Sequence, residues 1–171
     1  MLVTIRPASA ADLPAMVRIK HDAGLAAWQH ILPPEVIEEL PFLARWEAAI
    51  DSDEPRVGVL LAALDGRVVG FAMTRPSGDE GALPGTGELD GFYTDPAAWG
   101  AGAGRALLAA AAEALRGAGF SDATLWSAEL NHRPRRIYET AGWRLDGAER
   151  RRSFGGVEFN EVRYRLVTFG R

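Results

Sequence analysis

Residues 88–108 read ELDGFYTDPAAWGAGAGRALL, which combines a short strand-like stretch, a glycine-rich turn and the beginning of a helix. Residues 88–94 predict a strand that Asp95-Pro96 closes, and residues 105–118 predict a helix, because their leucines and alanines recur on one face. Glycines between a strand and a helix let a ligand approach the backbone closely. The helix start also presents free N–H groups at the positive end of its dipole. The unit therefore predicts an anion site whose natural guest is a phosphate or pyrophosphate.

The rest of the chain continues this alternation of strands and helices. Asp65-Gly66 between two apolar runs is a strong hairpin signal, and Pro41 is expected to interrupt or kink a second helical stretch. The expected strands are residues 2–6, 57–64, 68–74, 88–94, 123–128, 143–152 and 158–167, and the expected helices are residues 13–25, 35–50, 105–118 and 135–141. The order β-α-α-β-β-β-α-β-α-β-β predicts one α/β domain over residues 1–171 with a mixed sheet.

Composition excludes several classes of protein. The chain has 171 residues, of which 47% are hydrophobic and 25% charged, as in an ordinary globular domain. It has no cysteine, which excludes disulfides, thiolate nucleophiles and Cys-ligated zinc, and its 3 histidines lack ligand spacing, so we expect no metal. It contains no apolar run of about 18 residues and no signal-peptide pattern, so we expect a cytoplasmic protein that does not bind membranes.

Charge is distributed unevenly along the chain. Residues 1–55 carry 4 cationic and 9 acidic side chains, whereas residues 131–171 carry 10 cationic and 5 acidic ones. The overall net charge of −4 and the pI of about 5.4 argue against a nucleic-acid partner. The asymmetry itself is compatible either with a cationic substrate beside a polyanion or with ordinary solvated faces.

Three kinds of phosphate site can be compared with the glycine turn. A P-loop requires Gly-Lys-[Ser/Thr], and the chain contains no Gly-Lys. A dinucleotide site requires G-x-G-x-x-G after an early strand, whereas this turn has the spacing G-x-G-x-G and follows three or four strands. A coenzyme A pyrophosphate site is the third interpretation.

Residues 87–143 resemble the core of the GNAT superfamily of acyl-CoA-dependent N-acetyltransferases. The family motif is [Arg/Gln]-x-x-Gly-x-[Gly/Ala] after a strand, and Gly102 and Gly104 match its glycines, while Trp99 replaces the polar first position. Asn131, then Tyr138-Glu139 and Gly142-Trp143, resemble the family's Asn…Tyr-Glu-x-x-Gly-Phe segment at its usual spacing. The resemblance implies a single-domain GNAT fold with a mostly antiparallel sheet of six to seven strands, flanked by helices, and acetyl-CoA as co-substrate.

The same resemblance implies where the cofactor binds. Strands 88–94 and 123–128 would diverge, so that the pantetheine arm pairs with the open edge of the first. The implied contacts are the backbone of Phe92, Tyr93 and Thr94 for pantetheine, the N–H groups of Gly100, Ala101, Gly102, Ala103, Gly104 and Arg105 for the pyrophosphate, and Asn131 for the arm. Arg105, Arg133 and Arg136 are expected to compensate for Trp99 as partners of the phosphates.

The implied reaction is direct attack of a primary amine on the thioester carbonyl. Tyr138 stands at the family's general-acid position, and a base must remove a proton from the amine. Glu88 is the expected base, with Asp90 on the same side of the strand, where two carboxylates would raise each other's pKa. Glu129 is a further candidate.

The expected acceptor is a small cationic amine, or a protein N-terminus or lysine. Residues that would contact it are Trp28, His30, Asp90, Trp126 and Glu129, although Trp126 also fits a core position. Two other hypotheses stay open: a non-catalytic acyl-CoA sensor of the same fold, and a dinucleotide-binding oxidoreductase. The final strands mediate dimers in relatives, so a homodimer is also expected.

Overall fold

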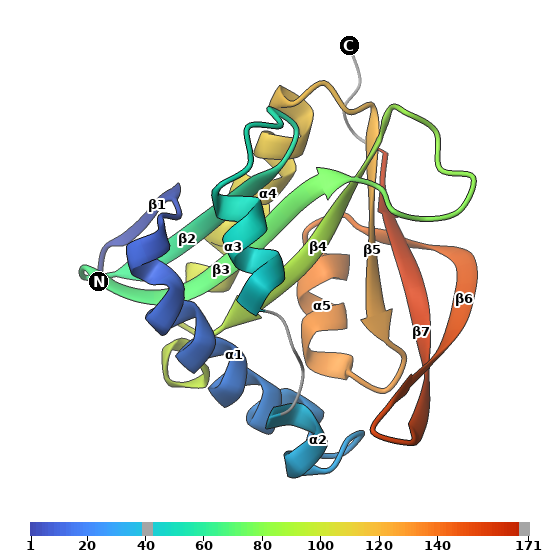
Figure 1. The fold of residues 1–171 in the computed structure, drawn as a ribbon, viewed down its shortest axis with the longest axis horizontal. Helices are drawn as coiled ribbons and strands as arrows, with labels where there is room; N and C mark the ends of the chain where they lie inside the picture. Colours follow the sequence, from blue (N-terminus) through green and yellow to red (C-terminus); the bar gives the residue numbers. More distant parts are fainter. Residues whose placement is uncertain (39–42, 168–171) are drawn as a thin grey trace.

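A seven-stranded sheet runs through the part of the chain that the computed structural model describes, residues 1–38 and 43–167 (Figure 1). The strands are β1 (Val3–Pro7), β2 (Gly58–Leu64), β3 (Arg67–Pro76), β4 (Thr86–Thr94), β5 (Asp122–Ala128), β6 (Arg144–Phe154) and β7 (Val157–Leu166). Their spatial order is β1-β2-β3-β4-β5-β7-β6, and neighbouring strands pair antiparallel except for the parallel pair β4 and β5. The expected mixed, mostly antiparallel sheet with flanking helices is confirmed.

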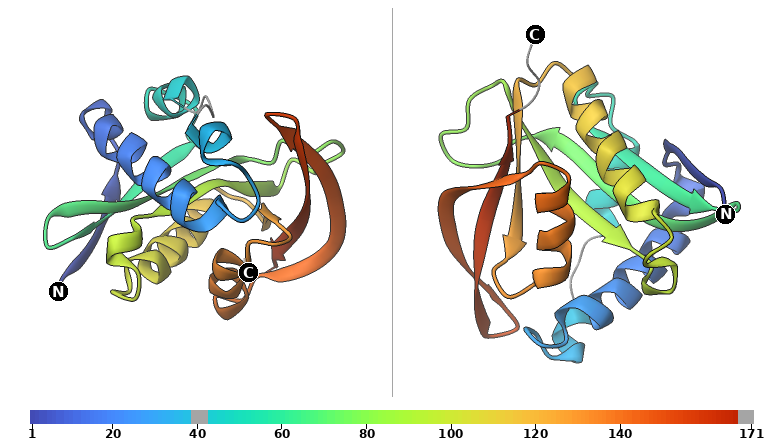
Figure 2. Two further views of the ribbon diagram at one scale, coloured as in Figure 1. Left: turned by 90° about the horizontal axis from the view of Figure 1, so that it is seen from below. Right: turned by 180° about the vertical axis from the view of Figure 1, so that it is seen from behind.

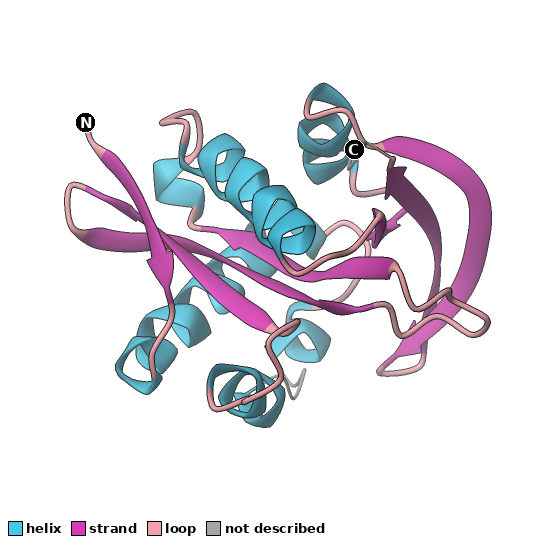
Figure 3. Ribbon diagram, turned by 90° about the horizontal axis from the view of Figure 1, so that it is seen from above, coloured by secondary structure: helices cyan, strands magenta, loops and turns pink. Residues whose placement is uncertain are grey.

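Helices cover both faces of this sheet (Figures 2 and 3). Helices α1 (Leu13–Trp28), α2 (Pro34–Glu38) and α3 (Leu43–Ile50) lie on one face, and α4 (Ala103–Gly117) and α5 (His132–Thr140) lie on the other. Two short 3-10 turns, η1 (Ala10–Asp12) and η2 (Pro96–Ala98), precede α1 and α4. None of the helices in the described ranges is long and apolar enough to cross a membrane.

Each face of the sheet has its own apolar core. Leu107, Leu108 and Leu115 of α4 are at most 1% exposed and pack against the sheet, as their spacing predicts. On the opposite face Met16 and Ile19 of α1 meet Trp46 of α3, which is 3% exposed. Trp46 contacts Phe71 edge-on at 4.9 Å between ring centroids, so it is a core residue.

Local backbone preferences explain the turns. Asp65 and Gly66 join β2 to β3 with φ values of 49° and 85°, as the Asp-Gly signal predicts for a tight hairpin. Gly142 has φ 93° immediately after α5, where a helix ends in the left-handed conformation.

Helix boundaries differ from the expectation in all four predicted helices. Helix α1 continues three residues past Leu25, since alanines favour helix and Trp28 packs edge-on against Phe159 at 5.5 Å. Helix α5 begins at His132 and not at Arg135. Pro134 is tolerated in the first turn, because the N–H that proline lacks would have no partner within the helix at that position. Helix α4 begins at Ala103, two residues early. The stretch expected at 35–50 contains α2 and α3, and Pro41 lies outside the described residues.

Candidate active site

The sheet opens where its two parallel strands diverge. β4 and β5 pair only between Thr86 and Glu88 on one strand and Asp122 and Thr124 on the other. Beyond that point β4 stays paired with β3, and β5 stays paired with β7, so the two strands separate from each other (Figure 1). The edge of β4 from residue 89 to residue 94 therefore offers backbone groups to an added chain or ligand.

A β-bulge bends β4 at this point. Thr74 of β3 lies opposite Leu89 and Met73 lies opposite Gly91, so Asp90 is the extra residue of β4. An extra residue in one strand bends it and increases its twist, which is why bulges occur beside active sites. The bulge accounts for the direction in which β4 leaves β5.

The glycine turn follows the end of β4. Gly100 and Gly102 both have φ 87°, and a Cβ at either position would meet no other residue within 4 Å. The first backbone hydrogen bond of α4 runs from the N–H of Ala106 to the carbonyl oxygen of Gly102 at 3.1 Å. The N–H groups of Ala103, Gly104 and Arg105 thus begin the helix without partners inside it, as at helix termini that bind anions. The N–H of Ala101 donates instead to the carbonyl oxygen of Ala98 at 3.2 Å.

A buried carboxylate anchors this turn. Asp95 is 3% exposed, and it accepts hydrogen bonds from the N–H of Ala97 at 2.9 Å and from Arg18 at 2.8 Å. Burial opposes the ionisation of Asp95, but the bonds from Arg18 and Ala97 and the charge of Arg67 outweigh it, and the pKa of Asp95 is lowered. Asp95 therefore stays ionised and holds the turn against α1.

Trp99 holds a cation against its ring. Its indole Nε1 donates to Thr94 Oγ1 at 3.0 Å, and the guanidinium of Arg133 lies 3.7 Å from its ring centroid. This stacking is a cation–π contact that holds Arg133 between α5 and the turn. The structure therefore holds the positive charge of Arg133 against Trp99, whose own side chain carries no charge.

A cavity of about 230 Å³ occupies the opening between β4 and β5. Its lining includes ten of the expected site residues: Trp28, Glu88, Asp90, Phe92, Tyr93, Thr94, Trp126, Asn131, Arg133 and Tyr138. Residues 100–105 and Arg136 do not line it, and Arg105 and Arg136 are exposed. The structure thus separates a central cavity from the glycine turn, which lies at the end of β4.

Two expected substrate contacts lie elsewhere. His30 and Glu129 line a second hollow together with Arg151 and Glu158, and neither residue lines the central cavity. The His30 ring contacts the carbonyl oxygen of Leu130 at 2.9 Å, and the N–H of Glu129 donates to Asn160 at 2.9 Å. The structure does not bring them into the cavity with Trp28, because α1 ends at Trp28 and β5 ends at Ala128, and the chain turns away after each.

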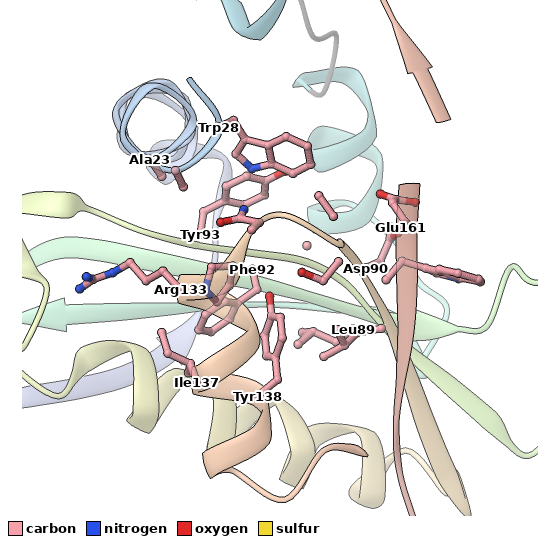
Figure 4. A pocket seen from close by; sticks show the side chains of 18 of the residues that line it. Ala23, Trp28, Leu89, Asp90, Phe92, Tyr93, Arg133, Ile137, Tyr138 and Glu161 are labelled. Carbon is pink, nitrogen blue, oxygen red and sulfur yellow. The ribbon is translucent and has the colours of Figure 1, made fainter. Parts of the chain in front are cut away.

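Tyr138 projects from α5 into the cavity (Figure 4). It is 6% exposed, and its ring lies 5.8 Å from that of Phe92 and 6.0 Å from that of Tyr164. Burial raises the pKa of Tyr138, so the phenol stays protonated at neutral pH. Within residues 1–38 and 43–167 its hydroxyl makes no hydrogen bond, which leaves the O–H available to a molecule in the cavity.

The two carboxylates of β4 are ion-paired. Glu88 contacts Arg75 at 3.1 Å and accepts the N–H of Gly78 at 3.0 Å. Asp90 contacts the same Arg75 at 3.1 Å and also Arg45. The expected pair of mutually repelling carboxylates is therefore replaced by a network in which guanidinium groups lie against both.

Sequence reasoning missed one wall of the cavity. Arg45, Arg150, Arg152, Phe154 and Glu161 line it as well. Three of them alternate along β6, at positions 150, 152 and 154, so strand periodicity applied to residues 143–152 and beyond could have found that face. Their closeness to β4, however, depends on how the β6–β7 hairpin curves.

The family model described as "Acetyltransferase (GNAT) family" matches residues 16–143. The chain is 32% identical over 162 residues to the uncharacterized N-acetyltransferase YuaI of Bacillus subtilis, with 84% of this chain and 89% of YuaI covered.

Solved structures share the whole fold. The PaiA N-acetyltransferase of Thermoplasma acidophilum, in complex with coenzyme A, has a TM-score of 0.78 and 18% identity, covering 97% of this chain and 100% of PaiA. The ribosomal-protein-alanine N-acetyltransferase of Brucella melitensis has a TM-score of 0.76 and 25% identity, covering 96% of this chain and 99% of its own.

Proposed function

The chain belongs to the GNAT family of acetyltransferases, and from this premise we propose that it transfers an acetyl group from acetyl-CoA to a primary amine by direct attack. One observation carries the proposal. The open edge of β4 leads from the glycine turn at the start of α4 to the hydroxyl of Tyr138. An extended cofactor arm paired with that edge would bring its thioester to the phenol.

The cofactor contacts in this proposal follow the geometry. The backbone of Phe92, Tyr93 and Thr94 pairs with the pantetheine arm, and the N–H groups of Gly100 and of residues 102–105 bind the pyrophosphate, since the N–H of Ala101 donates to Ala98. PaiA, which has the same fold, was crystallised with coenzyme A, and this supports the choice of cofactor.

Side chains around the opening complete the cofactor site. Asn131 is 4% exposed and lines the cavity, and it bonds the arm. Arg133 on its Trp99 support contacts the phosphates, and the exposed Arg105 and Arg136 add positive charge near the helix start.

The proposed chemistry balances with one acid and one base. The amine nitrogen forms a bond to the carbonyl carbon of the thioester, and the bond from that carbon to sulfur breaks. The ammonium nitrogen loses two protons in forming the amide: one passes to a base before attack, and the second leaves to solvent as the tetrahedral intermediate collapses. Tyr138 gives its proton to the departing sulfur and recovers one from solvent. Glu88 is the proposed base, acting directly or through a water molecule.

A substitution tests the role of Glu88. Glu88→Gln is expected to lower kcat/KM for the amine by about 100-fold, because a positioned base contributes about that much, while acetyl-CoA affinity changes by less than a few-fold. Glu113→Gln is the matched control, since Glu113 pairs with Arg116 on the exposed face of α4 at 2.6 Å. Full activity of Glu88→Gln would place the base at another residue.

The proposal as a whole is tested by parallel calorimetric titrations with acetyl-CoA, coenzyme A and NADH. Micromolar binding of acetyl-CoA without an NADH signal is expected, followed by thiol release when amines are added. Absence of binding by both coenzyme A species would contradict the proposal. Binding without thiol release from any amine would indicate a non-catalytic acyl-CoA sensor instead.

The proposal also covers the setting of the reaction. The chain acts as one N-acetyltransferase domain in the cytoplasm, with neither membrane nor nucleic acid as a partner and with no metal. Its final strands are the proposed contact between two copies.

A further inference from the structure

The wall of the cavity beyond Tyr138 carries more arginine than a site for a simple cationic amine requires. We call this wall the arginine end, and it consists of Arg45, Arg150, Arg152, Phe154 and Glu161. In Figure 4 Arg133 and Glu161 lie on opposite sides of Tyr138, so the arginine end lies away from the proposed phosphate contacts. It is the part of the cavity that an acceptor would occupy.

The carboxylates at this end already have partners. Glu88 and Asp90 lie against Arg75, and Asp90 also lies against Arg45. Glu161, which is 9% exposed, accepts a hydrogen bond from Arg150 Nε at 2.5 Å. A cationic acceptor would have to compete with these guanidinium groups for each carboxylate.

Arg152 differs from the other arginines of this wall. Its closest carboxylate is Glu161, 3.9 Å from its Nε, and Glu161 is already bonded to Arg150. Within residues 1–38 and 43–167 the Arg152 guanidinium makes no hydrogen bond, and its side chain is 44% exposed at the cavity. Arg45 and Arg75 lie against Asp90, and Arg150 is bonded to Glu161 and lies 3.9 Å from Asp79 as well, whereas Arg152 has only the 3.9 Å contact with Glu161.

Aromatic rings lie beside Arg152 and Arg150. Its guanidinium lies 5.3 Å from the ring centroid of Phe154, which stacks on Phe159 at 5.8 Å. Arg150 lies over Trp126 at 4.2 Å, so aromatic rings flank both guanidinium groups. A planar guanidinium that donates no hydrogen bond to a described residue and lies beside an apolar ring is suited to a carboxylate attached to an apolar body.

We infer that the acceptor is an amino-acid-type molecule, whose amine reacts at Tyr138 and whose carboxylate binds Arg152. This inference rests on the proposed function. It replaces the expected small cationic amine, because the acidic groups that would bind such an amine are occupied by arginines. It also disfavours a protein lysine or N-terminus, which has no free carboxylate next to its amine.

The test compares each amino acid with its own amide. L-phenylalanine and L-phenylalaninamide, and the same pair for leucine and for methionine, differ only in the carboxylate. The measured quantity is kcat/KM for each member of a pair, by thiol release from acetyl-CoA. The wild-type protein is expected to favour the amino acid in at least one pair.

In Arg152→Gln, kcat/KM for the amino acid divided by kcat/KM for its amide is expected to fall by about tenfold or more. The fall should come from a higher KM for the amino acid, while kcat/KM for the amide stays unchanged. Comparing ratios between proteins cancels the different basicity of the two amines. Arg151→Gln is the matched control, because Arg151 lies on the opposite face of β6 with a side chain 71% exposed, beside Glu158 at 3.7 Å.

Three results would overturn the inference: equal or better use of the amides by the wild-type protein, an equal loss for both members of a pair in Arg152→Gln, or the same shift in Arg151→Gln. A protein that acetylates amides or simple amines such as phenethylamine, but no amino acid, keeps the proposed function and loses this inference. Failure to bind acetyl-CoA is seen in the earlier titration, so the two failures are distinguishable.

Discussion

Gly102→Val is expected to lower the affinity for acetyl-CoA by about 100-fold or more, which is the largest effect on cofactor binding that we predict. Gly102 precedes α4 with φ 87°, and a Cβ there would meet no residue within 4 Å. The valine side chain would therefore extend into the space proposed for the pyrophosphate, and its left-handed backbone would cost about 1–2 kcal/mol. Calorimetric titration with acetyl-CoA measures the loss.

The control for Gly102→Val is Gly119→Val at the other end of α4. Gly119 has φ 85° and is equally open around its Cβ, so the two substitutions impose a similar backbone strain. Thermal unfolding should show a similar loss of stability in both variants, whereas only Gly102→Val should lose acetyl-CoA binding. Equal loss of binding in both would mean that the glycine turn acts through folding alone.

Tyr138→Phe is expected to lower kcat by about 100-fold or more while acetyl-CoA affinity stays within a few-fold, because a positioned acid contributes about that much. Phenylalanine keeps the ring contacts with Phe92 and Tyr164, and the lost hydroxyl has no hydrogen bond to any described residue. The variant should therefore fold normally. Steady-state kinetics with saturating amine, together with a titration of acetyl-CoA, measure the two quantities separately.

The pH dependence gives a second readout for Tyr138. Because burial raises the pKa of Tyr138, its acidic form is present below that pKa and is lost only as the pH rises through it. The alkaline side of the wild-type kcat profile should therefore show no decline from this group up to about pH 10, the ordinary pKa of tyrosine. If kcat declined near neutral pH in the wild-type protein and this decline disappeared in Tyr138→Phe, the conclusion that burial raises the pKa of Tyr138 would be contradicted.

Tyr164→Phe provides the structural comparison for Tyr138→Phe. The Tyr164 hydroxyl donates to Glu139 Oε1 at 2.6 Å and accepts from Arg135 Nε at 2.8 Å, so its removal should cost stability, about 1 kcal/mol for each bond. This variant should melt at a lower temperature and keep its kcat. If Tyr164→Phe lost turnover and Tyr138→Phe kept it, Tyr164 would be the acid and Tyr138 the structural residue.

The sequence by itself determined the elements and the order in which they occur. Asp65-Gly66 predicts its hairpin, and the glycines before α4 predict a turn with positive φ, because these features depend on the backbone preferences of a few adjacent residues. The apolar face of α4 depends on helical periodicity, which is also local. The relative position of the motif residues Asn131 and Tyr138 is local as well, because Asn131 is the N-cap of α5 and Tyr138 follows seven residues later in the same helix.

Only the tertiary structure decided which side chains meet in the cavity. The bulge at Asp90 sets where β4 leaves β5, and the β6–β7 hairpin brings Arg150 and Arg152 to face that opening. Asp90 meets Arg45 across a long stretch of chain, and this contact removes it from the free acidic groups expected for a cationic amine. Such pairings depend on burial and on the packing of elements that are distant in sequence. The sequence therefore predicted that acids and arginines would be present. The packing determined which of them form close ion pairs, and it left Arg152 at the cavity with only a 3.9 Å contact to Glu161.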